Sequence, residues 1–500
     1  MFKRNRYIIL IILAGLFLRV WHPLQFFQYS HDQDLAGWFI RDILINHHFR
    51  LIGQETSSHG IFIGPFFYYL QIPFYLLTHL DPAEALLLPI ILGTFAIFSI
   101  YFILTKIFSK TSGLIGALIY SLSVLIVFTD REVVPTMPVM LWSIWFLYAA
   151  WLIFKGKKYG YLITGLLIGL IWSINLQLVI LLPLVILAHF FSFSPPVSSK
   201  ALSRDLLKFF VFGVLFAIFL NIPFMAFEVR HGFQQTRALI TSLTSNKDYV
   251  AGTANGFLPK LDRTMQLVYK NTTNLFGINL LNINTKIMFW VLLIALVFLI
   301  YKKVINKKFG IILLLWQLIY ILFFTKISLN ISEYYLNGMN VIWILTAACA
   351  VNALIQNKKI KIVGYFLVAI FVISNLYLFF TRPVNANGYL ERKAVISYIK
   401  ENAAAHNYPC VSLSFIVSPG NDLGYRYFTW ELGLKTKKIS KDVPVYSIVF
   451  PLSMVDSFDK SFGALGVVNP DYKRYNNNVV QKACEGDDYT VTQPMFGFTK

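Results

Sequence analysis

Long apolar runs separated by short polar connections dominate the first 380 positions of the chain. Many of these runs approach the roughly 20 residues that an α-helix needs to cross the hydrocarbon core of a bilayer. The pattern predicts eleven membrane helices, with approximate ranges 6–22, 84–107, 112–129, 133–154, 160–174, 176–192, 209–226, 286–301, 309–325, 337–355 and 361–380. We therefore expect an α-helical polytopic membrane protein.

Lysine and arginine gather in every second connection between these predicted helices, as the positive-inside rule requires of cytoplasmic loops. The basic sets are Lys3, Arg4 and Arg6; Lys106 and Lys110; Lys155, Lys157 and Lys158; Lys200, Arg204 and Lys208; Lys302, Lys303, Lys307 and Lys308; and Lys358, Lys359 and Lys361. With eleven helices all six sets fall on one side, so we expect a protein of the plasma (inner) membrane with a cytoplasmic N-terminus and an external C-terminus. An error of one helix would break this alternation.

Composition supports the membrane class, because 57% of the residues are hydrophobic and only 14% are charged. A soluble protein of 500 residues could not cover that much apolar surface. The formal net charge of +20 would suggest a nucleic-acid partner in a soluble protein. Here the cytoplasmic loops account for it, so no nucleic-acid partner is expected.

The first apolar run follows three basic residues, as a secretory signal peptide would. Arg19 to Pro23 comes next, however, and this stretch offers no small-residue cleavage site. We therefore interpret residues 6–22 as a retained membrane anchor.

Two long segments are expected outside the membrane within the helical domain, which spans residues 1–381. Residues 21–82 contain an amphipathic helical pattern at 34–49 and an apolar, aromatic piece at 62–80. Membrane crossing by the second piece would invert the charge pattern, so we expect it to lie at the interface. Residues 227–286 are polar and predicted to be helical in part.

The tail, residues 382–500, changes character and predicts a small extracytoplasmic α/β domain. Apolar runs of strand length occur at 411–417 and 445–450, with helical patterns at 389–402 and 423–434. The tail contains Cys410 and Cys484, and a disulfide or two free thiols fit the sequence equally well. Cys349 falls in a predicted membrane helix, where core packing is expected.

An acidic cluster, Asp32-Gln33-Asp34, follows the first membrane helix on the external side. Carboxylates beside lipid are costly, and those found there usually have a partner or a function. This cluster is therefore the first candidate for chemistry.

The order of several features resembles a known family. One anchor and the acidic cluster precede Gly64 to Leu70, with the sequence Gly-Pro-Phe-Phe-Tyr-Tyr-Leu; Asp81-Pro82 then opens a helix, and Asp-Arg-Glu stands at 130–132. This order resembles the C-type glycosyltransferases of the membrane, closest to the family 39 group of protein O-mannosyltransferases and aminoarabinose lipid A transferases. The resemblance covers residues 1–230; beyond them it is one of topology.

The resemblance implies transfer of a sugar from a polyprenyl-phosphate donor, presented from the outer leaflet, to a hydroxyl group of a protein, glycan or lipid. It also implies that Asp32 is the essential acid of the first outer loop. Many relatives carry Glu directly after this acid, whereas this chain has Gln33 and then Asp34. Asp34 therefore has two interpretations: a second catalytic acid, or an acid that favours the start of a helix.

The chemistry can also be argued directly. An acceptor hydroxyl ionises far above pH 7, so a carboxylate acting as general base assists its attack on C1 of the sugar. The phosphate of the donor is its own leaving group, and nearby cations would stabilise it. No cofactor is certain, but Mg²⁺ or Mn²⁺ held by Asp32 and Asp34 would fit, because carboxylate oxygens suit these ions.

Seven further residues are candidates for binding the phosphate or sugar of the donor: Asp130, Arg131, Glu132, His59, Arg230, Tyr334 and Tyr335. Each has a structural alternative. The triplet 130–132 could be an interfacial ion-pair cluster, and Arg230 could extend to the polar interface. Tyr334 and Tyr335 could belong to the aromatic belt of the membrane.

A transporter or lipid flippase is the alternative function. Polar Asn221 and Gln317 lie within predicted helices, but transporters usually place ionisable groups near the middle of the membrane. In this chain the ionisable groups gather at one outer surface, which favours interfacial chemistry. The sequence identifies neither the sugar nor the acceptor.

Overall fold

The structure is a computed structural model and describes residues 2–56, 60–192, 199–244, 256–278, 284–326, 333–418 and 420–486. Each of the eleven apolar segments predicted from the sequence contains a helix or a pair of helices. They are α1 (Phe2–Val20), α4 (Leu87–Ile107), α5 (Lys110–Leu122) with α6 (Val124–Thr129), α7 (Val139–Phe154), α8 (Tyr159–Ile174), η3 (Leu176–Leu181) with α9 (Pro183–Ser192), α10 (Ser199–Leu220) with α11 (Ile222–Arg230), α14 (Thr285–Tyr301), α15 (Lys307–Lys326), α16 (Asn337–Gln356) and α17 (Lys361–Phe380).

Four helices in the described part of the chain are long and apolar enough to cross a membrane, namely Pro82–Ile107, Lys307–Lys326, Tyr334–Gln356 and Lys361–Phe380. A fifth results if the bent pair Lys208–Leu220 and Ile222–Arg230 counts as one span. Other apolar helices, such as α7 and α14, are 10–17 residues long. The chain is thus a multi-pass helical membrane protein, and the number of eleven spans stays a prediction.

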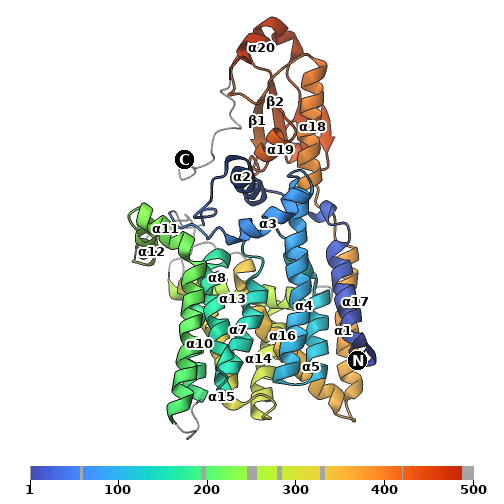
Figure 1. The fold of residues 1–500 in the computed structure, drawn as a ribbon. Coiled ribbons are helices and arrows are strands. Elements are labelled where there is room, and N and C mark those ends of the chain that lie inside the picture. Colours follow the sequence, from blue (N-terminus) through green and yellow to red (C-terminus); the bar gives the residue numbers. More distant parts are fainter. Residues whose placement is uncertain are drawn as a thin grey trace.

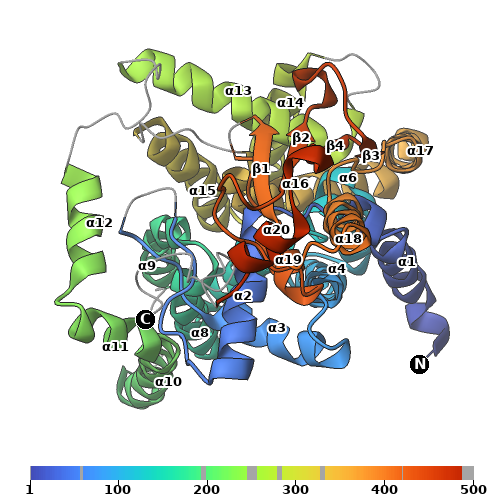
Figure 2. The same cartoon turned by 90° about the horizontal axis from the view of Figure 1, so that it is seen from above.

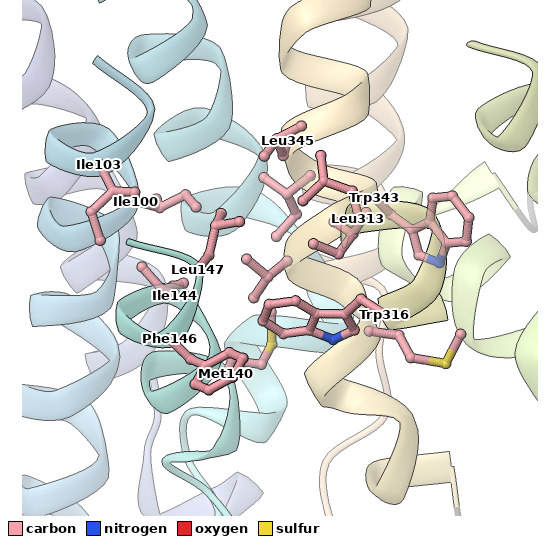
Figure 3. Packing of buried hydrophobic residues seen from close by; sticks show 14 of the residues in the cluster. Ile100, Ile103, Met140, Ile144, Phe146, Leu147, Leu313, Trp316, Trp343 and Leu345 are labelled. Atoms are coloured by element: carbon pink, nitrogen blue, oxygen red, sulfur yellow. The ribbon is translucent and has the colours of Figure 1, made fainter. Parts of the chain in front are cut away.

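A continuous apolar core holds the bundle together, as Figure 3 shows. Ile100 from α4, Phe146 from α7, Trp316 from α15 and Trp343 from α16 converge there, and each is at most 1% exposed. Burying side chains of this size against one another contributes dispersion contacts that need no aqueous phase. The bundle is therefore a packed unit and not a ring around a pore.

The segments predicted to be external lie mostly at the end of the bundle nearest the sheet (Figure 1), whereas α13 (Phe257–Phe276) packs on the bundle itself through Val268, Leu275 and Phe276. The first contains η1 (Leu24–Phe26), α2 (His31–Asn46), α3 (Phe66–Leu77) and η2 (Pro82–Leu86); the second contains α12 (Gln234–Thr244) and α13 (Phe257–Phe276); and η5 (Glu333–Leu336) precedes α16. In the view from above, α12 and α13 lie lengthwise, whereas α10 and α17 are seen end-on (Figure 2). The predicted partial helicity of residues 227–286 is confirmed.

The amphipathic helix of the first outer segment begins earlier than predicted, at His31 and not at residue 34. Ser30 and Gln33 form a capping box in which the Gln33 side chain accepts a hydrogen bond from the Ser30 N–H at 2.9 Å. This box satisfies backbone groups that a helix start otherwise leaves unpaired. The earlier start moves Asp32 and Asp34 into the first helical turn.

The tail forms a four-stranded sheet of β1 (Ser412–Val417), β2 (Val445–Phe450), β3 (Lys460–Phe462) and β4 (Leu465–Val468), in the order β1-β2-β4-β3. Strands β1 and β2 are parallel and pair Ser412 with Val445, whereas β4 is antiparallel to both of its neighbours. Helices α18 (Tyr389–Ala405), α19 (Arg426–Glu431) and α20 (Asn477–Ala483), and the turns η6 (Leu452–Met454) and η7 (Tyr472–Arg474), complete it. Both predicted strands are present, and Cys410 is joined to Cys484 by a disulfide.

One apolar core joins the tail to the first outer segment. It contains Leu35 and Phe39 of α2, Tyr68 of α3, and Val395 and Phe428 of the tail. Gly37 allows the Tyr427 ring to pack directly on α2, because a Cβ at this position would lie 2.7 Å from the ring. The sheet is therefore seated on the helix that carries the acidic cluster, as Figure 1 shows.

Candidate active site

Asp32 lies in the first turn of α2, and its side chain is only partly exposed. The Gln54 amide donates a hydrogen bond to Asp32 Oδ1 at 3.4 Å. Gln54 is itself fixed by Tyr68, whose hydroxyl donates to Gln54 Oε1 at 3.1 Å. The carboxylate is thus held in one orientation by the loop that follows α2.

Gln33, the residue between the two acids, connects α2 to a second segment. Its Oε1 accepts hydrogen bonds from the N–H and hydroxyl of Ser30, each at 2.9 Å. Its Nε2 donates to the Val133 carbonyl at 3.2 Å, in the connection between α6 and α7. This link brings the segment that contains Glu132 next to the start of α2.

Tyr334 contributes to the same site from η5. Its side chain interacts electrostatically with both Asp32 and Glu132, and its ring lies 4.2 Å from that of Tyr335. The Tyr334 ring is 40% exposed. Three segments far apart in the sequence therefore place Asp32 and Glu132 within electrostatic range of Tyr334, and we call these three residues the outer carboxylate site.

Both acids of the outer carboxylate site hold protons more tightly than usual. Burial raises the pKa of Asp32 above 3.8, and His31 and the Gln54 hydrogen bond offset only part of the rise. Burial also raises the pKa of Glu132 to about 7; Arg382 opposes this rise and Asp130 adds to it. A carboxylate with a raised pKa is a stronger base, and such groups often mark functional sites.

Arg382, just past the end of α17, is a site residue that sequence reasoning missed. Its charge opposes the rise in the pKa of Glu132, and its guanidinium lies 3.9 Å from the centre of the Phe128 ring. Its side chain is exposed. An exposed cation near Glu132 is suited to an anionic ligand, although the sequence alone marks Arg382 only as the first residue of the tail.

Asp130, predicted to contact the donor, is buried in an ion pair with Arg19. Arg19 Nε donates to Asp130 Oδ2 at 3.0 Å, and the Tyr120 hydroxyl donates to Oδ1 at 3.3 Å. The two charged side chains are 0% and 1% exposed. This geometry joins α1 to the end of α6 and gives Asp130 a structural role, so its contact with the donor stays a prediction.

Arg131 is also buried, with 3% of its surface exposed. Its Nη2 donates to the main-chain carbonyls of Leu18 and Trp21, the latter at 2.8 Å, and thereby ties down the end of α1. Within the part of the chain that the structure describes, Nε and Nη1 have no hydrogen-bond partner. The contacts thus indicate a tether, and a bond from the remaining N–H groups to a phosphate stays a prediction.

Asp34 faces away from Asp32, toward the tail. Its Oδ1 accepts a hydrogen bond from the Tyr427 backbone N–H at 2.9 Å, and the residue is 1% exposed. Burial raises the pKa of Asp34 to about 7, although the Tyr427 bond and the charges of Arg426 and Arg392 lower it in part. This geometry supports attachment of the tail; the catalytic role for Asp34 stays a prediction.

The raised pKa of Asp34 gives a testable dependence of stability on pH. Because the folded state binds its proton more tightly than the unfolded chain, the stability that Asp34 contributes is fully present below about pH 4 and is lost as the pH rises through about 7. The loss is on the order of 4 kcal/mol by pH 8. Asp34→Asn can still accept the Tyr427 N–H, so its melting temperature in detergent should exceed that of the wild type at pH 8. A lower value at pH 8 would contradict this reading.

A second polar contact fixes the tail to the outer layer. The Lys393 ammonium pairs with Asp81 at 2.7 Å and with Glu431 at 2.8 Å, and the Tyr389 hydroxyl donates to Asp81 Oδ1 at 2.7 Å. Burial raises the pKa of Asp81, but the bonds from Lys393 and Tyr389 outweigh it, so the net pKa is lowered. Ionised Asp81 therefore anchors α18 above η2.

Besides Asp34, Asp130 and Arg131, two more predicted residues are not part of the outer carboxylate site as described. His59 lies outside the described residues. Arg230 is exposed at the end of α11, and both views place α11 on the side of the molecule opposite α17 (Figures 1 and 2). The structure thus brings together Asp32, Glu132 and Tyr334, with Tyr335 alongside, and leaves Arg230 apart.

The fit of a divalent cation to Asp32 and Asp34 can be tested on their contacts. Asp34 is buried against Tyr427, whereas Asp32 is oriented by Gln54. Within the described ranges, no group of three or more His, Cys, Asp or Glu side chains could hold a metal ion. The two aspartates do not fit a shared ion in this arrangement, and we derive no step through one.

Comparison with known proteins gives one family match. The sequence model described as dolichyl-phosphate-mannose-protein mannosyltransferase matches residues 62–227. A search of curated proteins gives no match. The matched range contains the end of the first outer segment, α3 and Glu132, but not Asp32.

Several solved structures share the fold over nearly the whole chain. ArnT from Cupriavidus metallidurans bound to undecaprenyl phosphate is 12% identical, with 94% of this chain and 99% of that chain covered and a TM-score of 0.61. The same protein in the apo state gives 11% identity, coverage of 95% and 99%, and a TM-score of 0.58. The apo oligosaccharyltransferase of Archaeoglobus fulgidus is 12% identical, with 90% of this chain and 69% of that chain covered and a TM-score of 0.51.

At these identities the likeness establishes the fold, and the family match in residues 62–227 agrees with it. The resemblance predicted from the sequence is confirmed: this chain has the fold of the C-type glycosyltransferases of the membrane.

Proposed function

We propose that this protein transfers a sugar from a polyprenyl-phosphate donor to a hydroxyl acceptor at the outer face of the membrane. The observation that carries the proposal is the outer carboxylate site: the Gln33–Val133 hydrogen bond joins the segments that contain Asp32 and Glu132, and the charges of both acids act on Tyr334. The shared fold supports the lipid carrier, because ArnT was solved with undecaprenyl phosphate. The acceptor and the sugar stay open.

In this proposal Asp32 is the general base. Its carboxylate takes the proton of the acceptor hydroxyl as that oxygen forms a bond to C1 of the sugar. The C1–O bond to the phosphate breaks, and the polyprenyl phosphate leaves with the bonding electron pair. No second carboxylic acid must protonate this leaving group, in contrast to glycoside hydrolysis.

Glu132 and Arg382 are proposed to receive the donor. Burial keeps a proton on Glu132 up to about pH 7, so the acid can present a hydrogen-bond donor or a carboxylate to the sugar. The exposed Arg382 guanidinium can form charge-assisted hydrogen bonds to the phosphate and stabilise its departure. Tyr334 and Tyr335 are proposed to line the path of the lipid phosphate.

Arg382→Ala should therefore weaken use of the donor. Losing one hydrogen bond to a charged group corresponds to about 10–100-fold in kcat/KM for the donor. Arg230→Ala is the matched control, since Arg230 is also exposed but ends α11, which lies on the side of the molecule opposite α17 (Figure 2). Steady-state kinetics on both variants measure this. Equal losses, or a loss at Arg230 alone, would favour Arg230 as the phosphate ligand.

The proposal includes the topology predicted from the sequence: eleven spans, an N-terminus in the cytoplasm, and residues 382–500 exported from an inner membrane as a separate domain. The alternation of basic connections supports it. The disulfide between Cys410 and Cys484 is compatible with an oxidising external compartment. The Mg²⁺ or Mn²⁺ predicted at Asp32 and Asp34 stays a prediction from the sequence, and the mechanism above uses no metal ion.

The function is tested by supplying membranes that contain or lack this protein with polyprenyl-phosphate sugars radiolabelled in the sugar. We expect label to enter a protein, glycan or lipid product only where the protein is present. Label that enters equally from nucleotide sugars in washed membranes, or that never leaves the lipid donor, would contradict the proposal.

A further inference from the structure

A cavity of about 450 Å³ lies at the end of the bundle away from the outer carboxylate site. It is formed where the ends of α4 and α7 meet the turn between α14 and α15, on the side opposite the sheet (Figure 1). Its lining residues are Ile107, Phe108, Trp151, Phe154, Lys155, Lys303, Val304, Asn306, Lys307 and Phe309. The proposed sugar transfer uses none of them.

The rim of this cavity is strongly cationic. Lys155, Lys303 and Lys307 line it from two connections that are far apart in the chain. The connections that supply them, residues 155–159 and 302–308, contain no acidic residue. Among the residues that the structure describes, these three lysines form no ion pair with a carboxylate. The cavity therefore lacks an internal counter-charge.

Lysines that end α7 or α14 can be explained by the helix dipole, which is negative at a C-terminus. Lys307 cannot, because it begins α15, where the dipole is already positive. Lys303 adopts a left-handed backbone with φ 59°, which favours glycine over a residue with a side chain. At Lys307 a cation is therefore present where the helix dipole does not favour one, and an anionic ligand would offset its charge; Lys303, which follows the end of α14, has the dipole in its favour.

The wall of the cavity is apolar and aromatic. Trp151 and Phe154 are half-buried and Phe309 is buried, whereas the three lysines are exposed, and the Lys155 ammonium lies 5.7 Å from the centre of the Phe154 ring. A ligand that fits must combine a negative charge at the rim with hydrocarbon in the interior. A phospholipid with an anionic headgroup has this construction, whereas a free phosphate ion has no part that would fill the apolar wall.

We propose that this cavity binds an anionic phospholipid of the adjacent leaflet, with the phosphate between Lys155, Lys303 and Lys307 and the start of an acyl chain against Trp151 and Phe154. Basic pockets between membrane helices hold acidic lipid headgroups by this combination of charge and hydrocarbon contact. The site is separate from the proposed transfer reaction and does not depend on it.

The competing explanation is the general excess of positive charge on cytoplasmic loops, which attracts acidic lipids without a defined site. A matched pair of triple variants separates the two. Lys155→Gln, Lys303→Gln and Lys307→Gln together remove the charge at the cavity. Lys157→Gln, Lys358→Gln and Lys359→Gln remove the same charge from exposed positions that do not line it.

Binding is measured on the full-length protein in uncharged detergent, by native mass spectrometry during titration with phosphatidylglycerol or phosphatidylcholine. We expect one phosphatidylglycerol to bind the wild type and the control variant with similar affinity. The cavity variant should bind about 100-fold more weakly, at about five-fold per lysine. Equal weakening of both triple variants, or weakening of neither, would overturn the proposal.

Two further measurements keep the test decisive. Melting temperatures without lipid should agree for the wild type and the two triple variants. If the cavity variant is unstable, the single variant Lys307→Gln replaces it, and its affinity for phosphatidylglycerol should be about five-fold lower. Phosphatidylglycerol with brominated acyl chains should quench wild-type tryptophan fluorescence more than that of Trp151→Phe. Equal quenching in the two proteins would exclude a lipid in this cavity. A lipid would also be excluded if inorganic phosphate alone raised the wild-type melting temperature as much as phosphatidylglycerol does.

Discussion

Asp32→Asn is expected to lower the rate of sugar transfer by about 10²–10⁴-fold, the usual cost of losing a general base. The amide keeps the size of the carboxylate and can still accept the Gln54 hydrogen bond, but it cannot accept the acceptor proton. Because Asp32 is partly exposed and outside the apolar core, the melting temperature should hardly change. The measurement is kcat with a saturating donor, together with thermal unfolding in detergent.

Asp34→Asn is the matched control for this prediction, since it makes the same chemical change two residues away. Its carboxylate faces Tyr427 and not the outer carboxylate site, so most activity should remain. Equal losses in both variants, reversed by excess Mn²⁺, would instead indicate that the two aspartates share a metal. A fully active Asp32→Asn protein would exclude Asp32 as the base.

Asp130→Asn is expected to cause the largest loss of stability, on the order of 3–5 kcal/mol. It leaves the Arg19 guanidinium charged and 0% exposed, with no carboxylate to compensate it. Removing one member of a buried pair costs more than the pair itself contributes, because the remaining charge stays desolvated. The melting temperature in detergent measures the effect.

Asp42→Asn is the comparison for Asp130→Asn. Asp42 pairs with Arg50 at 2.8 Å, but the two side chains are 15% and 12% exposed, so water screens the charge that remains. The expected cost is about 1 kcal/mol or less. A double change, Asp130→Asn with Arg19→Gln, should recover part of the stability lost at Asp130. If Asp130→Asn and Asp42→Asn had equal small effects, the buried pair would not be structural.

The helices of the bundle could be predicted because apolar runs are long and their ends carry lysine or aromatic residues. The start of α2 could also have been predicted from the sequence, because Ser30 and Gln33 have the spacing of a capping box, which places the helix start before Asp32. The amphipathic pattern alone set it three residues too late. In the tail, β1 and β2 were predicted, whereas the short β3 and β4 carry too few residues for alternation to show.

The composition of the site was predictable only in part, since it depends on contacts between distant segments. Asp32 and Glu132 were both candidates, but nothing in the sequence showed that Gln33 joins their two segments through the Val133 carbonyl. Arg19 and Asp130 are 111 positions apart, so their pairing depends on how α1 packs beside α6. Arg382 belongs to the site because the end of α17 lies beside Phe128, and the sequence does not show this contact.

The central claim, that this protein breaks the bond between the sugar and the lipid phosphate, is tested most directly by following the phosphorus of the donor. Purified protein in liposomes is mixed with a polyprenyl-phosphate sugar and an acceptor extract, and ³¹P NMR records conversion of the phosphodiester to the monoester.

We predict that the wild type releases one polyprenyl monophosphate for each sugar transferred, and that Asp32→Asn releases almost none in the same time. A phosphodiester that persists unchanged while the lipid-linked sugar moves between leaflets would contradict the account and would support a flippase instead.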